Sequence, residues 1–111
     1  MEDWGEIPNF DGRYLISVNG EVLDTKNDRI IKPHFMGVPR KNYYQVTLYK
    51  KNLKGTEKHT KRIHSLMAIT FLGHEYGDRK IVVDHIDNNH LNNKLSNLQV
   101  ITNKLNCIKD R

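Results

Sequence analysis

The 111-residue sequence predicts an α+β fold, in which a small antiparallel β module is followed by a strand, a polar loop, a second strand and a helix. Short apolar and β-branched runs separated by turn residues predict the strands of the first half. An apolar stripe with helical period follows, and two further apolar runs then enclose an asparagine-rich segment. This order of patterns is typical of a chain whose strands come before its helices.

The first hairpin is predicted at residues 13–26. Apolar residues flank Asn19 and Gly20, a dipeptide that readily supplies the two positive φ angles of a type I′ turn. We therefore expect two short antiparallel strands that meet at this dipeptide.

Three further strands are predicted before the helix. Residues 29–35 and 43–50 are strand candidates, separated by a turn at residues 37–39 that contains glycine and proline. A second hairpin turn at residues 52–55 leads into a strand at residues 57–64. The first half is therefore predicted to consist of β-hairpins.

A helix is predicted at residues 62–73. Ile63, Met67 and Phe71 recur at intervals of four residues, which places apolar side chains on one face. Gly73 is well placed to end the helix. We interpret the stripe as core, and His64 at the helix start as a packing or phosphate-contact residue.

The C-terminal unit is predicted to contain strands at residues 81–86 and 98–101, joined by a polar connection at residues 87–97. A short helix is predicted at residues 102–110, where Thr102 can accept a hydrogen bond from the first turn as its cap.

Composition excludes several classes of protein. Hydrophobic residues make up 37% of the chain and charged residues 28%, which indicates a globular protein. The single cysteine, Cys107, excludes an internal disulfide and a cysteine-rich zinc site, so we expect no structural zinc. No apolar run approaches the roughly 18 residues of a membrane helix, and the start MEDWGEIP lacks signal-peptide features. We expect an intracellular protein with no membrane partner.

Positive charge is concentrated in one segment. Residues 1–39 carry seven acidic and four basic groups, whereas residues 40–62 carry eight basic groups and one acidic residue, Glu57. Tyrosines alternate with these basic residues, a composition that favours contact with a phosphate backbone. The alternative is a solvated lysine-rich hairpin. The candidate DNA-binding residues are Arg40, Lys41, Lys50, Lys51, Lys54, Lys58, Lys61 and Arg62.

Three polar residues of the C-terminal unit could meet at one point. Asp84 and His85 end the first strand, and Asn106 lies one turn into the final helix. Histidine suits a general base because its ordinary pKa lies near neutrality, and carboxylate and amide oxygens suit Mg²⁺. Because neighbouring strand residues face opposite sides, Asp84 and His85 can serve one site only if the strand ends or kinks there.

These residues carry a resemblance. The motifs RIHSLMAITFL and IVVDHIDNNHLNNKLSNLQVITNKLN resemble the HNH endonucleases of bacteriophages and their introns, which have the ββα-metal fold. The resemblance covers about residues 60–108. It implies that His85 is the general base and that Asp84 and Asn106 bind one divalent metal, Mg²⁺ or Mn²⁺, per active site. It also implies that Asn97 fixes the loop between the strands by hydrogen bonds.

Other residues compete for these roles. Asn103 lies three residues before Asn106 on the same predicted helix face, and Asp87 and His90 could also reach a metal. The remaining loop asparagines are expected to bond their neighbouring backbone and to adopt left-handed conformations where turns need them. These residues are Asn88, Asn89, Asn92 and Asn93.

The first half is similar to a nuclease-associated modular motif that often precedes HNH units. The similarity lies in WGEIPNFDGRYLISVNGEVLDTK, with its initial tryptophan and its Y-x-I-S run before the Asn-Gly turn. We expect residues 1–55 to be a β-rich module that supports DNA contact and residues 56–111 to be the nuclease unit. The expected core residues of the module are Trp4, Phe10, Tyr14 and Val22.

The expected function is that of a metal-dependent endonuclease or nickase on double-stranded DNA, leaving 5′-phosphate and 3′-hydroxyl ends. The alternative is a non-catalytic DNA-binding module or regulator on an HNH-like scaffold. A homodimer or a phage partner protein could supply specificity, and the cytoplasm of a bacterial host is the expected location if a phage encodes the chain.

Overall fold

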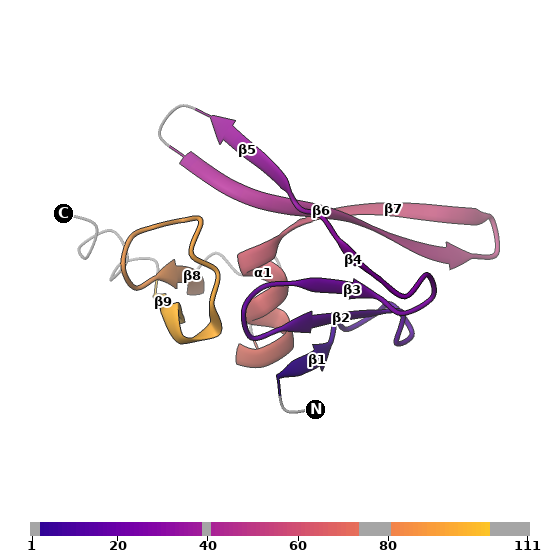
Figure 1. Ribbon diagram of the computed structural model, residues 1–111, viewed down its shortest axis with the longest axis horizontal. Coiled ribbons are helices and arrows are strands. Elements are labelled where there is room, and N and C mark those ends of the chain that lie inside the picture. The colour runs from indigo at the N-terminus through magenta and orange to yellow at the C-terminus, as the bar shows by residue number, and fades with distance from the viewer. Residues whose placement is uncertain (1–2, 39–40, 74–80, 103–111) are drawn as a thin grey trace.

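The computed structural model describes residues 3–38, 41–73 and 81–102. Three antiparallel sheets, one short α-helix and two further helical turns make up this part of the chain (Figure 1), in agreement with the predicted α+β class. The first sheet has the strand order β1-β2-β3-β4, the second β5-β6-β7 and the third β8-β9. The strands are β1 (Trp4–Glu6), β2 (Tyr14–Ser17), β3 (Val22–Asp24), β4 (Arg29–Ile31), β5 (His34–Val38), β6 (Lys41–Asn52), β7 (Gly55–Arg62), β8 (Ile81–His85) and β9 (Leu98–Thr102). The helical segments are α1 (Ile63–Met67), the π-helical turn η1 (Ala68–Leu72) and the 3-10 turn η2 (Leu95–Asn97).

The first hairpin is confirmed, but its turn differs from the prediction. Strands β2 and β3 pair with Ile16 opposite Val22, and of the predicted dipeptide only Gly20 has a positive φ, 88°. Ser17 explains the difference, because its Oγ accepts backbone hydrogen bonds from Asn19 and Glu21 at 3.1 Å each. The serine side chain therefore holds a longer loop than a two-residue type I′ turn.

The strand predicted at residues 29–35 is two strands in two different sheets. Strand β4 pairs with β3, whereas β5 pairs with β6, and the break falls at Lys32 and Pro33. Proline has no N–H to donate to a ladder, so the strand cannot continue through it. Gly37 belongs to β5 and pairs with Asn42, so the turn predicted at residues 37–39 does not begin at this glycine.

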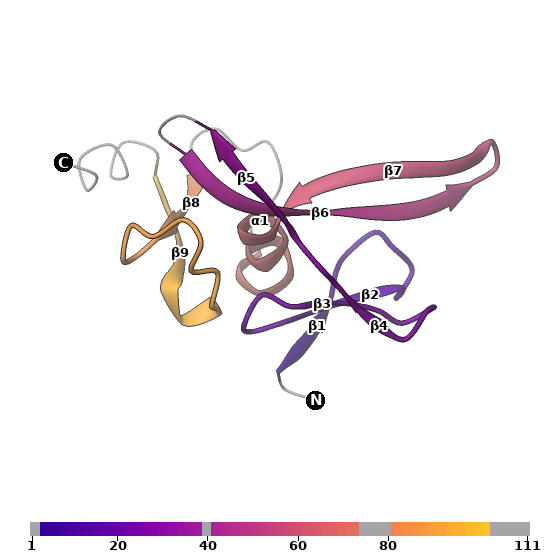
Figure 2. The ribbon, with the colours of Figure 1, turned by 45° about the horizontal axis from the view of Figure 1, so that its top comes forward.

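Strands β6 and β7 form a long two-stranded ribbon that extends away from the rest of the molecule (Figure 2). Its pairing runs from Gln45 opposite Arg62 to Asn52 opposite Gly55, which confirms the second hairpin turn. At the turn, the N–H of Lys54 donates to Asn52 Oδ1 at 2.8 Å. The chain passes directly from β7 into α1.

The predicted helix is confirmed, and its second half is π-helical. Ile63, Leu66 and Met67 are buried, as the apolar stripe predicts. Gly73 adopts the left-handed conformation, with φ 69°, and its N–H donates to the carbonyl of Ala68, so it ends the helix as expected.

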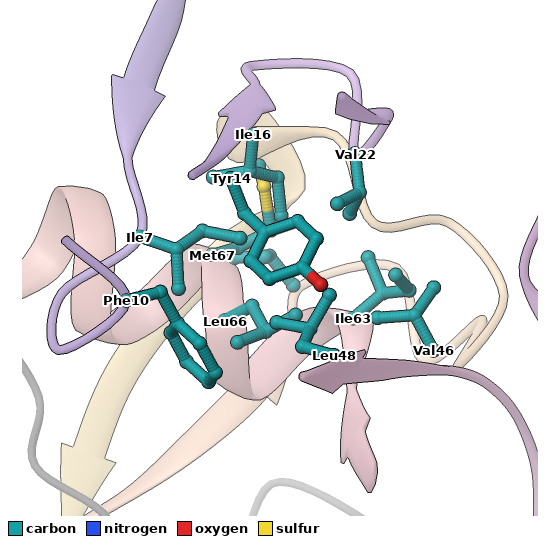
Figure 3. Packing of buried hydrophobic residues seen from close by; sticks show 11 residues of the cluster. Ile7, Phe10, Tyr14, Ile16, Val22, Val46, Leu48, Ile63, Leu66 and Met67 are labelled. Carbon is teal, nitrogen blue, oxygen red and sulfur yellow. The ribbon is translucent and has the colours of Figure 1, made fainter. Parts of the chain in front are cut away.

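One hydrophobic core joins the first half of the chain to the second (Figure 3). It consists of Ile7, Phe10, Tyr14, Ile16, Val22, Val46, Leu48, Ile63, Leu66, Met67 and Leu98. The hydroxyl of Tyr14 accepts the N–H of Tyr49 at 2.9 Å, which ties β2 to β6. Of the four residues predicted as core in the module, only Trp4 is partly exposed.

The division at residues 55 and 56 stays a prediction. It falls in the turn of the β6–β7 ribbon, and the core contains residues from both sides of it. Among the described helices, none has the length and apolar character needed to cross a membrane.

Candidate active site

Asp84 and His85 are the last two residues of β8. They lie opposite Gln99 and Leu98 of β9, and each is only 5% exposed. The chain turns immediately afterwards, because the N–H of Asn88 donates to the carbonyl of His85 at 2.8 Å. The strand therefore ends directly after His85, and the two neighbouring side chains leave it on opposite sides.

Asp84 is held by its partner across the sheet. Gln99 Nε2 donates to Asp84 Oδ2 at 2.8 Å, as paired residues on one face of a sheet can do. The other predicted ligand, Asn106, and its rival Asn103 lie outside the described residues, as does the predicted helix beyond Thr102, which ends β9. Across residues 3–38, 41–73 and 81–102, no group of three or more His, Cys, Asp or Glu side chains is placed to hold a metal.

His85 lies between two other imidazoles. The ring of His90 stacks on the ring of His85, with 5.2 Å between the two centroids. The ring of His64 meets the His85 ring edge-on, with 5.0 Å between the centroids. Burial lowers the pKa of His85 and the charge of His90 adds to this, while a hydrogen bond to Asn93 and two nearby carboxylates oppose it. The lowered pKa favours neutral imidazole, which is the form that can accept a proton.

His64 is partly buried at the start of α1. Burial is the largest cause that lowers its pKa to about 3, and the positive charges of His85, Arg62 and His90 add to it. Its Nδ1 is buried and has no hydrogen-bond partner among the described residues. This position agrees with a packing role at the start of α1.

Asn97 and Asp87 fix the loop between β8 and β9. Asn97 Oδ1 accepts the N–H of Asp87 at 3.1 Å, and its Nδ2 donates to Asp87 Oδ1 and to the carbonyl of Asn92 at 2.9 Å each. Asn92 Nδ2 donates to Asp87 Oδ2 at 2.9 Å, and the N–H of Asn89 donates to Asp87 Oδ1. Together with the bond from Asn97, these hydrogen bonds lower the pKa of Asp87 to about 2. The Asp87 carboxylate is thus used by the loop, and the effect of Asn97 on cleavage stays a prediction.

Two other asparagines have distinct local roles. Asn88 adopts φ 63°, the left-handed conformation expected for loop asparagines. Asn93 is only 7% exposed, and its Oδ1 lies 2.8 Å from His85 Nε2, instead of bonding only to neighbouring backbone as predicted. Nearby, the N–H of Leu95 donates to the carbonyl of Val18 at 2.7 Å, so the loop contacts the first hairpin.

The basic candidates do not share one face of the ribbon. Residues that pair across the strands share a face, and neighbours alternate, so Lys51, Lys58 and Arg62 lie on one face and Lys50 and Lys61 on the other. The first face also carries Tyr43 and Tyr49, and we call these five residues the ribbon face. The guanidinium of Arg62 lies 4.4 Å from the centre of the Tyr43 ring.

The second face includes the buried Val46 and Leu48 and therefore points toward the core. Lys54 lies at the turn of the ribbon. Lys41 begins β6, and Arg40 lies outside the described residues.

The sequence did not reveal the partners of the two central residues. Gln99 could have been found from the pairing of the strands, once the length of the connecting loop was fixed. Asn93 is one of several asparagines in the loop, and nothing in the local pattern separates it from Asn92.

Two family models match parts of the chain. The model of the HNH endonuclease family matches residues 61–107, which include β8, the loop and β9. The model of the NUMOD4 motif matches residues 2–49.

Relatives match almost the whole chain. The DNA endonuclease I-HmuI of Bacillus phage SP01 is 35% identical over 105 residues, which are 94% of this chain and 55% of the relative. The H-N-H endonuclease F-TflII of Escherichia phage T5 is 33% identical over 111 residues, covering 98% of this chain and 52% of the relative.

A solved structure described as "DNA binding and cleavage by the HNH homing endonuclease I-HmuI" matches with a TM-score of 0.78 at 33% identity. The match covers 96% of this chain and 56% of that one, so the chain spans about half the length of these relatives. Residues 61–107 therefore match the HNH endonuclease family, residues 2–49 match the NUMOD4 motif, and the chain is homologous to the phage homing endonuclease I-HmuI.

Proposed function

We propose that this protein is a metal-dependent DNA endonuclease or nickase that hydrolyses phosphodiester bonds, leaving 5′-phosphate and 3′-hydroxyl ends. The observation that carries the proposal is the buried Asp84–His85 pair at the end of β8, inside a domain homologous to nucleases. An acid and a base side by side at a strand end provide the two groups that assisted hydrolysis needs.

His85 is the proposed general base. Its lowered pKa keeps the imidazole neutral at neutral pH, so one ring nitrogen can take the proton of the attacking water. The hydroxyl oxygen of that water then forms the new bond to phosphorus, while the bond to the 3′ oxygen breaks.

Asp84 is the described residue that suits the metal. Its carboxylate offers hard oxygen atoms, and Mg²⁺ in phosphate-processing sites takes one or two carboxylates, waters and substrate phosphate. Asn106 would supply a second oxygen by resemblance. When bound, the cation supplies positive charge that stabilises the phosphate and the leaving oxygen.

The ribbon face is the proposed surface for the DNA backbone. Lys51, Lys58 and Arg62 are exposed on it, and Tyr49 beside them is 41% exposed. Contacts of lysine and arginine with phosphates position a duplex but carry little sequence information.

A plasmid assay tests the activity. Supercoiled plasmid is incubated with the protein and Mg²⁺ or Mn²⁺, with a chelator as the control, and nicked or linear product is expected only with metal. The variant His85→Ala is expected to bind DNA but not to cleave it, whereas the exposed His34→Ala should cleave like the parent. Cleavage by His85→Ala at the parent rate would contradict the proposed base, and binding without cleavage by the parent would favour a non-catalytic DNA-binding protein.

A further inference from the structure

Asn93 is a buried polar residue in contact with the proposed base, His85. It lies in the loop between β8 and β9, eight residues after His85, and is only 7% exposed. Its Oδ1 lies 2.8 Å from His85 Nε2, in a bond between buried side chains. A buried amide oxygen at this distance needs a donor, because leaving it unbonded costs about 1–3 kcal/mol.

The chemistry of the two groups determines the position of a proton. An amide oxygen can only accept a hydrogen bond, so the bond requires a hydrogen on Nε2 of the imidazole. In a neutral imidazole only one nitrogen carries hydrogen, and Nδ1 is then the nitrogen whose lone pair can accept a proton. The bond to Asn93 therefore selects between the two tautomers of His85.

We propose that Asn93 is a positioning residue, whose amide oxygen holds the proton of His85 on Nε2 and leaves Nδ1 as the atom that accepts the proton from water. This inference rests on the proposed role of His85 as the base. It assigns to one asparagine of the loop an effect on the reaction that the other loop asparagines do not have.

The first hairpin lies close to Asn93. A Cβ atom built on Gly20 would lie 3.4 Å from the Cβ of Asn93 and 3.6 Å from its carbonyl oxygen, so the hairpin approaches the loop closely. Two residues later, the N–H of Leu95 donates to the carbonyl of Val18 at 2.7 Å. Contacts with the first hairpin therefore constrain the backbone on which the Asn93 side chain is carried.

Nuclear magnetic resonance can test the tautomer directly. The full chain is labelled with ¹⁵N-histidine, and long-range ¹H–¹⁵N correlations are recorded without metal at about pH 8, above the ordinary histidine pKa of about 6.5. The His85 signals are identified by their loss in His85→Gln. We expect a protonated Nε2 and an unprotonated Nδ1 in the parent.

Three variants separate positioning from packing. Asn93→Leu has a similar size but no acceptor, and we expect it to lose the tautomer preference and at least tenfold of the roughly 10²–10⁴-fold effect of a general base. Asn93→Asp keeps an acceptor, so it should keep hydrogen on Nε2 and cleave faster than Asn93→Leu. The exposed Asn89→Leu is the matched control and should change neither the tautomer nor the cleavage rate. DNA affinity should be the same in all three.

Several results would overturn the inference. These are a parent His85 protonated on Nδ1, an Asn93→Leu variant that cleaves at the parent rate, or equal losses in Asn93→Leu and Asn93→Asp that follow their loss of thermal stability. If Asn93→Leu does not fold, Asn93→Ala and Asn89→Ala take the places of the leucine variants. If the parent cleaves no DNA, the proposed function fails, while the tautomer spectra still decide the role of Asn93.

Discussion

Gln99 and Asp84 face each other across β8 and β9, and the amide of Gln99 donates to Asp84 Oδ2 at 2.8 Å. Partners of this kind orient a carboxylate before it binds a metal, and their loss typically weakens metal affinity by roughly 10–100-fold. The proposed metal site therefore extends to β9.

Replacing Gln99 by leucine is expected to raise the Mg²⁺ concentration needed for half-maximal cleavage by about tenfold. A titration of plasmid nicking against Mg²⁺ measures this midpoint. DNA affinity measured with a chelator present is the control and should not change. An unchanged midpoint would show that Gln99 does not orient a metal ligand.

Replacing Asn97 by alanine is expected to lower the free energy of unfolding by about 2 kcal/mol, because three hydrogen bonds are lost, two of them to Asp87. Urea unfolding measures the change. Asn89→Ala, which removes one exposed hydrogen bond to the N–H of Leu91, should cost less than about 1 kcal/mol. Equal costs in the two variants would contradict the central place of Asn97 in the loop.

The two faces of the ribbon should differ in their effect on DNA binding. Lys51→Gln and Lys58→Gln are each expected to weaken binding and to reduce the slope of log affinity against log salt by about one. Lys50→Gln removes the same charge from the opposite face, where Lys50 pairs with Glu57, and should have a smaller effect. Equal effects of all three variants in a fluorescence titration would show that the ribbon face is not the DNA surface.

The stability of the protein is expected to fall with acid because of His64. Its pKa in the folded protein, about 3, lies below the value of about 6.5 for an unfolded chain, so the unfolded state binds the proton first. The stability is therefore fully present above about pH 6.5 and is lost as the pH falls toward 3. His64→Phe should show a shallower decline in unfolding free energy over this interval, and parallel curves for parent and variant would contradict the assignment.

The conformation of Asn88 makes it more sensitive to substitution than an exposed loop asparagine usually is. Its φ of 63° costs a residue with a Cβ roughly 1–2 kcal/mol unless local hydrogen bonding compensates. We expect Asn88→Gly to unfold at the same urea concentration as the parent and Asn88→Ala at a lower one. Identical midpoints for the two variants would show that this conformation is not retained.

The sequence predicted the elements better than it predicted their partners. The hairpin around Gly20, the helix that begins at Ile63 and the strands that enclose the asparagine loop follow from periodicity and turn residues, which are local properties. The type I′ turn was wrong because the hydroxyl of Ser17 bonds the loop in another way, and the single strand at residues 29–35 was wrong because of Pro33. Both errors depend on local chemistry that apolar patterning does not describe.

For the candidate site as well, the sequence indicated the central residues but not their partners. Asp84 and His85 were identified from their motif, and the structure gives their burial and the residues around them. The contacts of Gln99 and Asn93 depend on strand register and on how a loop of many similar residues folds, so no short pattern indicates them. Asn106 lies outside the described residues, and its role as a ligand stays a prediction.

The contact between Val18 and Leu95 has a consequence for exchanging modules between homologous chains. A chimera that joins the residues after the ribbon turn to a foreign N-terminal module would retain Asp84 and His85 but lose the hairpin against which their loop folds. An exchange of modules would then require a donor hairpin with a glycine at the place of Gly20 and a free carbonyl at the place of Val18. Compatibility at these two backbone positions, more than overall similarity, would decide which chimeras assemble an ordered loop.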